Sequence, residues 1–596
     1  MKEGEVKMEK QKKWFVAAKK ADFNKLSKKY GISPITARCI VNRDVSETDV
    51  GKYLFGKRSD MYNAKLLLNA ELAAKHIKTA IKAKKKIRII GDYDVDGVMA
   101  SEILNHGLTK CGANVDYIVP HRIEDGYGLN ENLIRKAYED GIDMIITCDN
   151  GIAAKDQINL ANELGMQVIV TDHHEVPYVE VNGEKEYVLP EALVVVDPKQ
   201  PNETYPFIGI CGALVAFKVI DLLYELYRIP KKELDFLLQF AAFATVCDVM
   251  ELKDENRIVV REGLRVINET PCKGIEKLIE ATGLSEKTIT AGHLGFILGP
   301  CVNASGRLDT ALKAIELLEE TDDDKAMLLA IELKNLNDDR KHLTEEKVAE
   351  ALHMIETTSL NDDMILTVKI DDCHESIAGI IAGRIRERYN KPTLVFTDVE
   401  TGLKGSGRST EAYNMFEELN KHRDMFIKFG GHKMAAGMSV DSIDTLNAIR
   451  KILNEETTLT EDDLAEITHI DMELPIEYAT LELANDLKLL EPFGVANSSP
   501  LFAIRDLQIT RAVEMGAKHN AMRYHVKTKY GLRSVVYDFG NIDVFINHLK
   551  EKYGETVMED LAMAKRDDVF ETITYKLDVN SYNGKDNVQI VMDNFK

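Results

Sequence analysis

Three aspartates stand at alternate positions in RIIGDYDVDG, which covers residues 88–97. Asp92, Asp94 and Asp96 come directly after a short apolar run. Carboxylates held this close repel one another, and each raises the pKa of its neighbours unless a cation lies among them. The segment therefore predicts a cation site.

Two further polar motifs follow apolar runs in the same way. Asp149 ends the run DMIITCD, and Asp172, His173 and His174 end the run QVIVTDHH. Carboxylate oxygens combined with imidazole nitrogens form a ligand set that suits Mn²⁺ or Mg²⁺. So many acids could hold two ions, and a pair of such ions is the arrangement that hydrolyses phosphoesters. We therefore predict phosphoester hydrolysis, with Mn²⁺ or Mg²⁺ as cofactor and two ions per site.

Each motif alone also has a purely structural explanation. An acidic loop after a strand is often a turn in which aspartate side chains accept hydrogen bonds from the local backbone. Adjacent histidines are often capping or core residues rather than ligands. The combination of all three motifs favours the metal site.

Apolar runs alternate with amphipathic segments of about 10 to 15 residues from residue 71 to about residue 250. This alternation is typical of βαβ units and predicts an α/β fold with a mostly parallel sheet. In open sheets of this kind, ligands bind at the carboxyl edge. The three polar motifs all lie at strand ends, so we expect them to meet there.

The rest of the chain divides by pattern. Residues 1–70 are rich in lysine and predict a helical N-terminal leader, followed by the first α/β domain at residues 71–310. Residues 311–357 contain no Gly or Pro and repeat apolar residues at helical spacing, which predicts a long connecting helix. A second α/β domain is expected at 358–455. Residues 456–596 alternate as strands do, with an Asn583-Gly584 hairpin turn, and predict a small β-barrel.

Length and composition limit the number of domains and the location of the protein. A chain of 596 residues should hold several domains, because single cores stop growing at about 250 to 300 residues. The apolar run LLQFAAFATVC is much shorter than the roughly 20 residues that span a bilayer. The first residues do not resemble a signal peptide. We therefore expect a cytoplasmic protein that does not enter a membrane.

Cysteine usage and charge are less informative. The eight cysteines include no C-x-x-C pair, so we expect free thiols rather than disulfides or structural zinc. The net charge of −22 argues against a nucleic-acid partner. That argument is weak, because phosphate is bound by a local basic surface and metal sites add acidic residues of their own.

The motifs GDYDVDG, TCDNG and TDHH resemble, in this order, those of the DHH phosphoesterase superfamily. FATVCDVMEL, with Asp248, is similar to the segment that carries the fourth metal-binding acid of that superfamily. CHESIAGIIAGRIRERYNKPTLVF, GSGRS and FGGHKMAAGMS resemble its associated DHHA1 domain. PHRIEDGYGLN, NASGRL and EPFGVANSSPLF are similar to segments of the bacterial single-strand-specific DNA exonucleases in the superfamily. The resemblance extends from about residue 70 to 540.

The resemblance implies a fold and an activity. The fold would be a two-lobed DHH/DHHA1 core with parallel sheets joined by a long helix, plus a C-terminal OB-like β-barrel. The activity would be 5′-to-3′ hydrolysis of single-stranded DNA to 5′-mononucleotides, in DNA repair and recombination. Single-stranded DNA would be the partner, with a single-strand-binding protein and a helicase as further partners.

The resemblance also implies roles for individual residues. The metal ligands would be Asp92, Asp94, Asp96, Asp149, His173 and Asp248, with Asp149 bridging two ions. His174 would be a ligand or lie close to one, and Asp172 would orient an imidazole. The residues that hold substrate phosphates, including the 5′-terminal one, would be Arg122, Arg307, Ser406, Arg408 and His432. Ser406 and Arg408 lie in a glycine-rich segment that we expect to be a turn.

Selection of single strands needs a basic groove with aromatic faces. We expect a cleft between the two lobes that admits one strand and is too narrow for a duplex. The basic candidates are Lys404, Arg408, Lys428, His432, Lys433, Arg505, Arg511, Lys518, Arg523 and His525. Tyr524 and Phe502 are candidates to stack on bases.

The sequence departs from the family at Asp197, where relatives usually have Asn; this adds negative charge near the site. Cys247 and Cys301 are further departures. Two other functions stay open: a DHH phosphodiesterase acting on short oligonucleotides or cyclic dinucleotides, and a non-catalytic DHH scaffold. Residues 456–596 argue against the first, and the intact metal-binding positions argue against the second.

Overall fold

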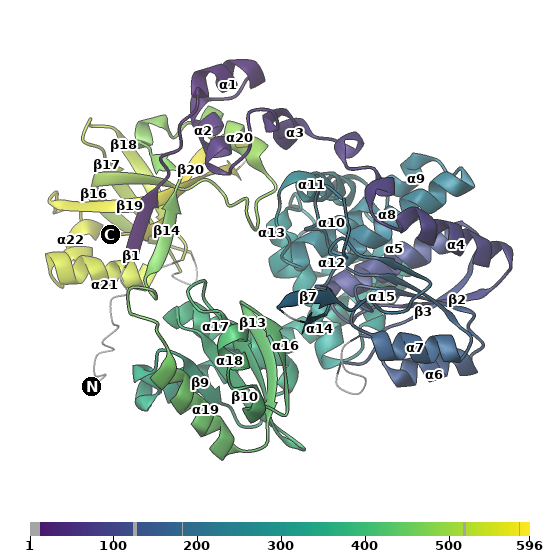
Figure 1. Cartoon of the computed structure of the whole chain (residues 1–596). Helices are drawn as coiled ribbons and strands as arrows, with labels where there is room; N and C mark the ends of the chain where they lie inside the picture. The colour runs from purple at the N-terminus through teal and green to yellow at the C-terminus, as the bar shows by residue number, and fades with distance from the viewer. Residues whose placement is uncertain (1–11, 123–127, 182, 517–519, 541, 583) are drawn as a thin grey trace. The chain divides into compact units, whose positions relative to one another are not determined.

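The computed structural model describes residues 12–122, 128–181, 183–516, 520–540, 542–582 and 584–596 (Figure 1). The described chain forms two compact units. The larger unit comprises Met61–Met250 and Ile258–Ala465. The smaller unit comprises residues 12–60, Glu251–Arg257 and Glu466–Lys596.

The first sheet of the larger unit is entirely parallel. Its strands are β2 (Lys86–Ile90), β3 (Asn114–Ile118), β4 (Met144–Cys148), β5 (Gln167–Thr171) and β8 (Val194–Val196), in the order β3-β2-β4-β5-β8. Nearly every residue of β2, β4, β5 and β8 is buried, as expected of parallel strands that are covered on both faces. The predicted parallel sheet is confirmed.

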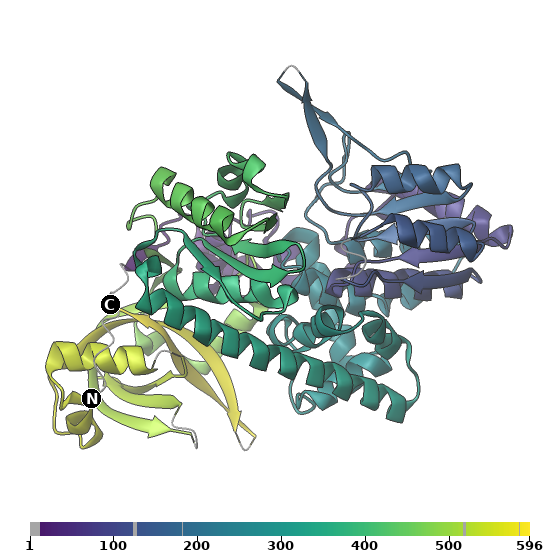
Figure 2. The ribbon, with the colours of Figure 1, turned by 90° about the horizontal axis from the view of Figure 1, so that it is seen from below.

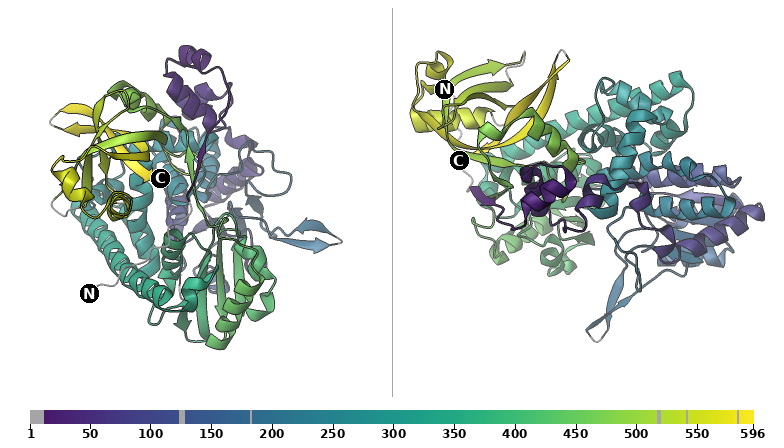
Figure 3. Two further views of the ribbon diagram at one scale, coloured as in Figure 1. Left: turned by 90° about the vertical axis from the view of Figure 1, so that its left-hand side faces the viewer. Right: turned by 90° about the horizontal axis from the view of Figure 1, so that it is seen from above.

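Helices cover both faces of this sheet. One face packs against α4 (Ala70–Lys82), α5 (Val95–Lys110) and α8 (Gly212–Tyr227). The other face packs against α6 (Glu131–Glu139) and α7 (Lys155–Glu163). Between β5 and β8 the chain forms an exposed hairpin of β6 (Tyr178–Val181) and β7 (Glu184–Tyr187), which projects from the sheet (Figures 2 and 3).

A run of helices follows the sheet. It contains α9 (Lys231–Asp235), α10 (Leu238–Cys247), α11 (Asp254–Glu269), α12 (Lys273–Ala281), α13 (Ala291–His293), the π-helical η3 (Leu294–Leu298), α14 (Gly299–Leu308) and α15 (Leu312–Glu319). The predicted long helix is α16 (Asp323–Thr357), with 35 residues. It packs against α12, α14 and α15 near its start and against α17 further along, and Figure 2 shows its full length.

The second sheet of the larger unit is mixed. Its order is β12-β13-β11-β10-β9, with strands β9 (Leu366–Lys369), β10 (Thr393–Val399), β11 (Gly402–Arg408), β12 (Lys428–His432) and β13 (Ala435–Val440). Only the β9–β10 pair is parallel. Its accompanying helices are α17 (Ala378–Tyr389), α18 (Met415–Asn420) and α19 (Ile443–Glu456).

The smaller unit contains the predicted β-barrel. Strands β16 (Phe502–Met515), β17 (Ala521–Lys527), β18 (Arg533–Asp538), β20 (Lys585–Phe595) and β19 (Val569–Tyr582) pair in this order, and β19 pairs back to β16. That last pairing closes a five-stranded barrel, so the C-terminal prediction is confirmed. Strand β15 (Met472–Glu473) pairs in parallel with the start of β16. Asn583 of the predicted hairpin turn lies outside the described residues.

The N-terminal residues share a core with the barrel. Helices α1 (Phe23–Tyr30), α2 (Pro34–Asn42) and α3 (Val50–Phe55) bury Leu26, Ile40 and Leu54 in one cluster with barrel residues. Strand β1 (Lys12–Val16) pairs in parallel with β14 (Glu466–Ile470). Helices α20 (Leu481–Leu487), α21 (Ile542–Tyr553) and α22 (Val557–Ala562) complete the unit. The expected N-terminal helices are present, together with a strand that the sequence did not suggest.

All eight cysteines are free thiols, as expected. Among the described helices, none combines the length and apolar composition that crossing a bilayer requires.

Candidate metal centre

The strand order brings the three polar motifs to one edge of the parallel sheet. Strand β2 has β3 on one side and β4 on the other, so the chain reverses direction across the sheet at this point. Asp92 follows β2, Asp149 follows β4 and Asp172 follows β5. Such a switch point is where open α/β sheets bind ligands. Asp248 joins from the C-terminal end of α10.

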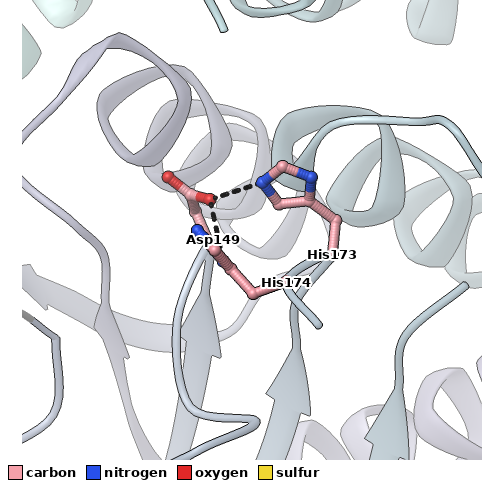
Figure 4. Close-up of side chains that lie close together, drawn as sticks. All are labelled: Asp149, His173 and His174. Carbon is pink, nitrogen blue, oxygen red and sulfur yellow. Dashed lines mark ion pairs between the residues drawn. The ribbon is translucent and has the colours of Figure 1, made fainter. Parts of the chain in front are cut away.

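Carboxylate oxygens from three other segments converge on His173. Its Nε2 lies 3.1 Å from Oδ1 of Asp149, 3.5 Å from Oδ2 of Asp96 and 3.7 Å from Oδ2 of Asp248. Figure 4 shows the Asp149 carboxylate next to both histidines.

Among the residues that the structure describes, three groups of side chains have ligand atoms within 4.8 Å of one another. The groups are Asp149 with His173 and His174, Asp96 with His173 and Asp248, and Asp92 with Asp94 and Asp149. They include all six predicted metal ligands. Asp149 and His173 each belong to two of these groups, and the bridging role of Asp149 stays a prediction.

Backbone contacts fix the aspartates that follow β2. The Asp94 side chain caps α5 by accepting a hydrogen bond from the Gly97 backbone N–H at 3.1 Å. Asp96 accepts from the N–H groups of Gly212 and Ala213, at 2.6 and 2.7 Å, where α8 begins. The start of a helix favours a carboxylate because its N–H groups are unsatisfied and carry partial positive charge.

Asp172 orients His174. Its Oδ1 accepts from Nδ1 of His174 at 2.8 Å and from the backbone N–H of His173, while Oδ2 accepts from the Ile152 N–H. Burial opposes ionisation of Asp172, but the hydrogen bond and charge of His174 outweigh it and lower the pKa. Burial also opposes protonation of His174, yet Asp172 raises the pKa of this imidazole to about 9. This geometry matches the role expected for Asp172.

The carboxyl groups of the centre need a cation. Burial is the main cause that raises the pKa of Asp92, Asp149 and Asp248, the last to about 8, and neighbouring aspartates raise each further. Oδ1 of Asp92 is buried, and within the described part of the chain it has no hydrogen-bond partner. Hard oxygen donors with imidazole suit Mn²⁺ and Mg²⁺. The residues present therefore fit divalent ions.

A cluster of guanidinium groups lies beside the acids. Burial is the main cause of the lowered pKa of Arg307, to about 10, and of Arg408, and the charge of Arg122 lowers both further. Arg122 stands over the Tyr93 ring, 4.7 Å from its centre. Arg307 donates to the Ser376 carbonyl at 2.6 Å. Guanidinium groups that lower the pKa of one another indicate an anion site, since an anion would offset their repulsion.

The glycine-rich segment before Arg408 is a strand, so its prediction as a turn was wrong. In β11 the side chains of Ser406 and Arg408 share one face, and Arg408 donates to Oγ of Ser406 at 3.2 Å. A Cβ at Gly405, on the other face, would lie 2.5 Å from the Phe396 ring. The glycines therefore permit close packing in a sheet. His432 ends β12 in the same sheet, and its pKa is lowered by burial and then by Arg408.

The structure gives different outcomes for the expected DNA contacts. Phe502 and Tyr524 are buried in the core of the smaller unit, because alternation along the strands points them inward, so their stacking role was wrong. Lys404, Lys433 and Arg505 form ion pairs with glutamates. Lys518 and residues 123–127 of PHRIEDGYGLN lie outside the described residues.

Sequence reasoning missed Lys199. It lies in the turn after β8, at the same sheet edge as the metal motifs, and its Nζ is 3.0 Å from Oε1 of Glu175. The only feature of the sequence that could have pointed to Lys199 is its position shortly after the end of a strand.

Known domains match most of the chain. Residues 86–244 match the DHH family, N-terminal domain. Residues 362–458 match the DHHA1 domain, and residues 470–594 match the RecJ OB domain.

Whole relatives and a solved structure agree with these matches. The single-stranded-DNA-specific exonuclease RecJ of Bacillus subtilis (strain 168) is 35% identical over 509 residues, which are 85% of this chain but only 63% of the relative. The protein of that name from Haemophilus influenzae is 30% identical over 94% of this chain and 96% of its own length. The crystal structure of RecJ with Mn²⁺ from Thermus thermophilus has a TM-score of 0.78 at 24% identity, covering 98% of this chain and 80% of that one. At that identity, the structural likeness shows the fold.

Proposed function

The chain belongs to the RecJ family of single-stranded-DNA-specific exonucleases, and from this premise we propose that it is a metal-dependent exonuclease of single-stranded DNA. The observation that carries the proposal is the grouping of six candidate ligands at one sheet edge beside three guanidinium groups. The proposal extends to 5′-to-3′ direction, to 5′-mononucleotide products and to roles in repair and recombination. It also includes a cytoplasmic location, with a single-strand-binding protein and a helicase as further partners.

The chain's own residues prepare the reaction. When bound, divalent ions at the aspartates would lower the pKa of a water and offset the charge of the phosphodiester. Asp172 holds Nδ1 of His174 at 2.8 Å and so fixes the orientation of this imidazole beside Asp149. Burial of Asp96 and Asp149 excludes bulk water from the ligand side of the centre.

The guanidinium groups suit recognition of a strand end. A planar guanidinium can form two parallel hydrogen bonds to a phosphate. Arg408 is held by the Gly407 carbonyl at 2.7 Å and Arg307 by that of Ser376, so both enter the site already oriented. A terminal phosphate, which carries more charge than an internal one, would be the preferred anion.

The experiment that tests this function is digestion of a single strand labelled at either end, with and without a 5′ phosphate. Reactions contain Mn²⁺, Mg²⁺ or a chelator. We expect mononucleotides released from the 5′ end, only with a divalent ion, and faster from a 5′-phosphorylated strand. Asp149→Ala should lose Mn²⁺ binding in calorimetry and at least a hundredfold in rate. Blunt duplex cut as fast as single strands, or full activity of Asp149→Ala, would contradict the proposal.

The outer face of the barrel supports a long single strand as substrate. Cross-strand pairs place Arg511 beside His525, Arg523 beside Tyr537 and Lys527 beside Arg533 on this face, while the alternate residues point inward. Tyr537 stacks on Phe539 at 6.0 Å, and the Phe539 side chain is exposed. Cations next to aromatic faces are what single-strand readers use. This surface favours long strands over the short substrates of other DHH phosphodiesterases.

Removing one cation from this face gives a specific prediction. Among the described side chains, none forms an ion pair with Arg523, so Arg523→Ala should weaken binding of a 30-nucleotide single strand about three- to tenfold and reduce its salt dependence. Fluorescence anisotropy without divalent ions measures both. The matched control is Arg505→Ala on the same barrel, where Glu473 already neutralises the charge at 2.5 Å. Equal effects of the two variants would remove the barrel face from the proposal.

A further inference from the structure

Lys199 is fixed beside the loop that carries the two histidines. It lies in the turn after β8, and β8 pairs in parallel with β5, with Val196 opposite Thr171. The turn therefore starts next to Asp172, the residue after Thr171. The Lys199 backbone N–H donates to Oδ1 of Asp197 at 2.7 Å, which holds the turn in place.

The side chain of Lys199 reaches back over that loop. Its Nζ is 3.0 Å from Oε1 of Glu175, the residue directly after His174. The lysine side chain is 25% exposed, whereas that of Glu175 is 87% exposed. An ion pair with so exposed a partner contributes little to stability. Glu175 can therefore leave at little cost when a stronger anion arrives.

The charge of Lys199 acts on both sides of the site. Burial is the main cause of the shifted pKa values of His173 and Asp248, and Lys199 is one of the charges that act on each. In the second lobe, the pKa of His432 is lowered by burial, then by Arg408, then by Lys199. The ammonium group thus lies within electrostatic reach of two metal ligands and of a candidate phosphate contact.

A lysine in this position needs an anion. An ammonium group has only donors and cannot be a metal ligand. Beside bound divalent cations it would be repelled, unless a negatively charged group were shared between the ions and the lysine. Glu175 is mostly in solvent, so it does not fill that place.

We propose that Lys199 binds the phosphodiester that is being cut, by exchanging Glu175 for a non-bridging phosphate oxygen. The inference rests on the proposed function and names a substrate contact on the first lobe, in addition to the arginines. Glu175 would then act as a competing anion that weakens binding of DNA.

The test compares Lys199→Gln, Lys199→Arg and Glu175→Gln with Lys185→Gln as control. Lys185 is a lysine of the same lobe that stands over the Tyr178 ring on the projecting hairpin. Anisotropy of a labelled single strand without divalent ions gives the dissociation constant and its salt dependence. Digestion with Mn²⁺ gives kcat and KM, and calorimetry gives Mn²⁺ affinity.

For Lys199→Gln we expect the dissociation constant and KM to rise about tenfold. The slope of the logarithm of affinity against the logarithm of salt concentration should fall by about one, the change expected when one phosphate contact is lost. Lys199→Arg should keep most of the binding, and Glu175→Gln should bind more tightly than the native enzyme. None of the three variants should lose Mn²⁺ affinity, because Lys199 is not a metal ligand and its charge repels the ions, and retained binding also shows that the site is folded. Lys185→Gln should behave as native.

Unchanged DNA binding and KM in Lys199→Gln, with a native enzyme that digests DNA, would overturn this inference alone. A loss of Mn²⁺ affinity in both Lys199 variants would also overturn it, because the lysine would then be needed to hold the metal centre together. If the native enzyme digested no single strand with any ion, the proposed function itself would fail.

Discussion

At the scale of single residues, Asp197 is a buried acid that lies outside the ligand groups. The residue is fully buried, and in the described structure its Oδ2 has no hydrogen-bond partner. Burial is the main cause that raises its pKa to about 7, with Asp172 next. In the unfolded chain the same carboxyl would titrate near about 3.9. The fold therefore favours its protonated form.

The sign of the resulting pH dependence follows from linkage. Below about pH 4 both states hold the proton, and above about pH 7 both have lost it. Between these limits only the native state holds it, so native stability falls as pH rises. Relative to the native protein, Asp197→Asn should gain about 1 to 3 kcal/mol in free energy of unfolding between pH 5 and pH 8.

Denaturant unfolding of both metal-free proteins at several pH values measures this difference in free energy of unfolding. Asp156→Asn, an exposed aspartate in the first turn of α7, is the control and should show no such trend. A gap for Asp197→Asn that stayed constant with pH would mean that this carboxyl ionises normally in the fold.

The acids after β2, β4 and β5 could be predicted to meet, because each motif directly follows an apolar run and the ends of parallel strands share one edge. Asp248 lies at the end of α10 and was suggested only by the family resemblance. Sequence reasoning could not place Lys199, since its partner Glu175 is distant in sequence and the turn has ordinary composition. The predicted stacking of Phe502 and Tyr524 on bases was wrong for another reason. Alternation gives two faces to a strand, and only closure of the barrel decides which face is inside.

At the scale of elements, the junction between β2 and α5 sets the shape of the metal centre. Here the chain folds back so tightly that a Cβ at Gly97 would lie 2.4 Å from the Asp92 carbonyl oxygen. Contacts this short with backbone cannot be relieved by a side-chain rotation. Glycine at this position thus lets Asp92 and Asp94 lie in one candidate ligand group.

Gly97→Ala should displace this loop and reduce Mn²⁺ affinity at least tenfold, with a parallel loss of nuclease activity. Calorimetry and digestion of a labelled strand measure the two effects. The control is Gly383→Ala in α17, where a Cβ would meet nothing within 4 Å. Because alanine favours a helix by about 1 kcal/mol over glycine, that variant should be slightly more stable and fully active. Native Mn²⁺ affinity in Gly97→Ala would show that the loop tolerates a side chain.

The period of apolar residues predicted the parallel sheet and the long helix, because each of these elements has a local signal. The second sheet was harder. Strand β11 reads GLKGSGR and has no alternation of apolar residues, so its glycines suggested a turn. Its strand character depends on pairing with β10 and β13, which no short segment reveals.

At the scale of the molecule, the smaller unit is assembled from three separate parts of the chain. Arg257 joins them: its guanidinium donates to the carbonyls of Tyr53, Leu490 and Glu491 at 2.7 to 2.8 Å. The side chain is buried and also stands over the Tyr53 ring, 3.9 Å from its centre. One residue thus satisfies several buried acceptors at once.

Arg257→Leu should destabilise the smaller unit by about 3 kcal/mol or more, because several carbonyls would be left without donors. Trp14 is the only tryptophan of the chain and packs against the core of Ile470, Leu501 and Ala503, so its fluorescence reports on this unit. We expect its unfolding midpoint to fall while Mn²⁺ binding by the larger unit is retained. Arg265→Leu, which removes an exposed arginine from α11, is the control. Equal midpoints for the two variants would contradict a joining role for Arg257.

Sequence patterns could not reveal this assembly. The first residues and the barrel each have local signals, but their shared core depends on contacts between distant segments. Net charge was likewise a poor guide, because the basic row on the barrel is local while the chain as a whole is acidic.

The pairing of β1 with β14 has a consequence for biosynthesis. Lys12 is paired with Glu466, so the ribosome must add 454 further residues before that partner exists. At about 5 to 20 residues per second, the wait is on the order of half a minute or more. Throughout that interval the nascent chain holds Trp14 and Phe15 on a strand without its native partner, where chaperones or neighbouring chains on the same messenger RNA can bind it. A strand that is translated well before its partner is therefore among the last elements to reach its native pairing.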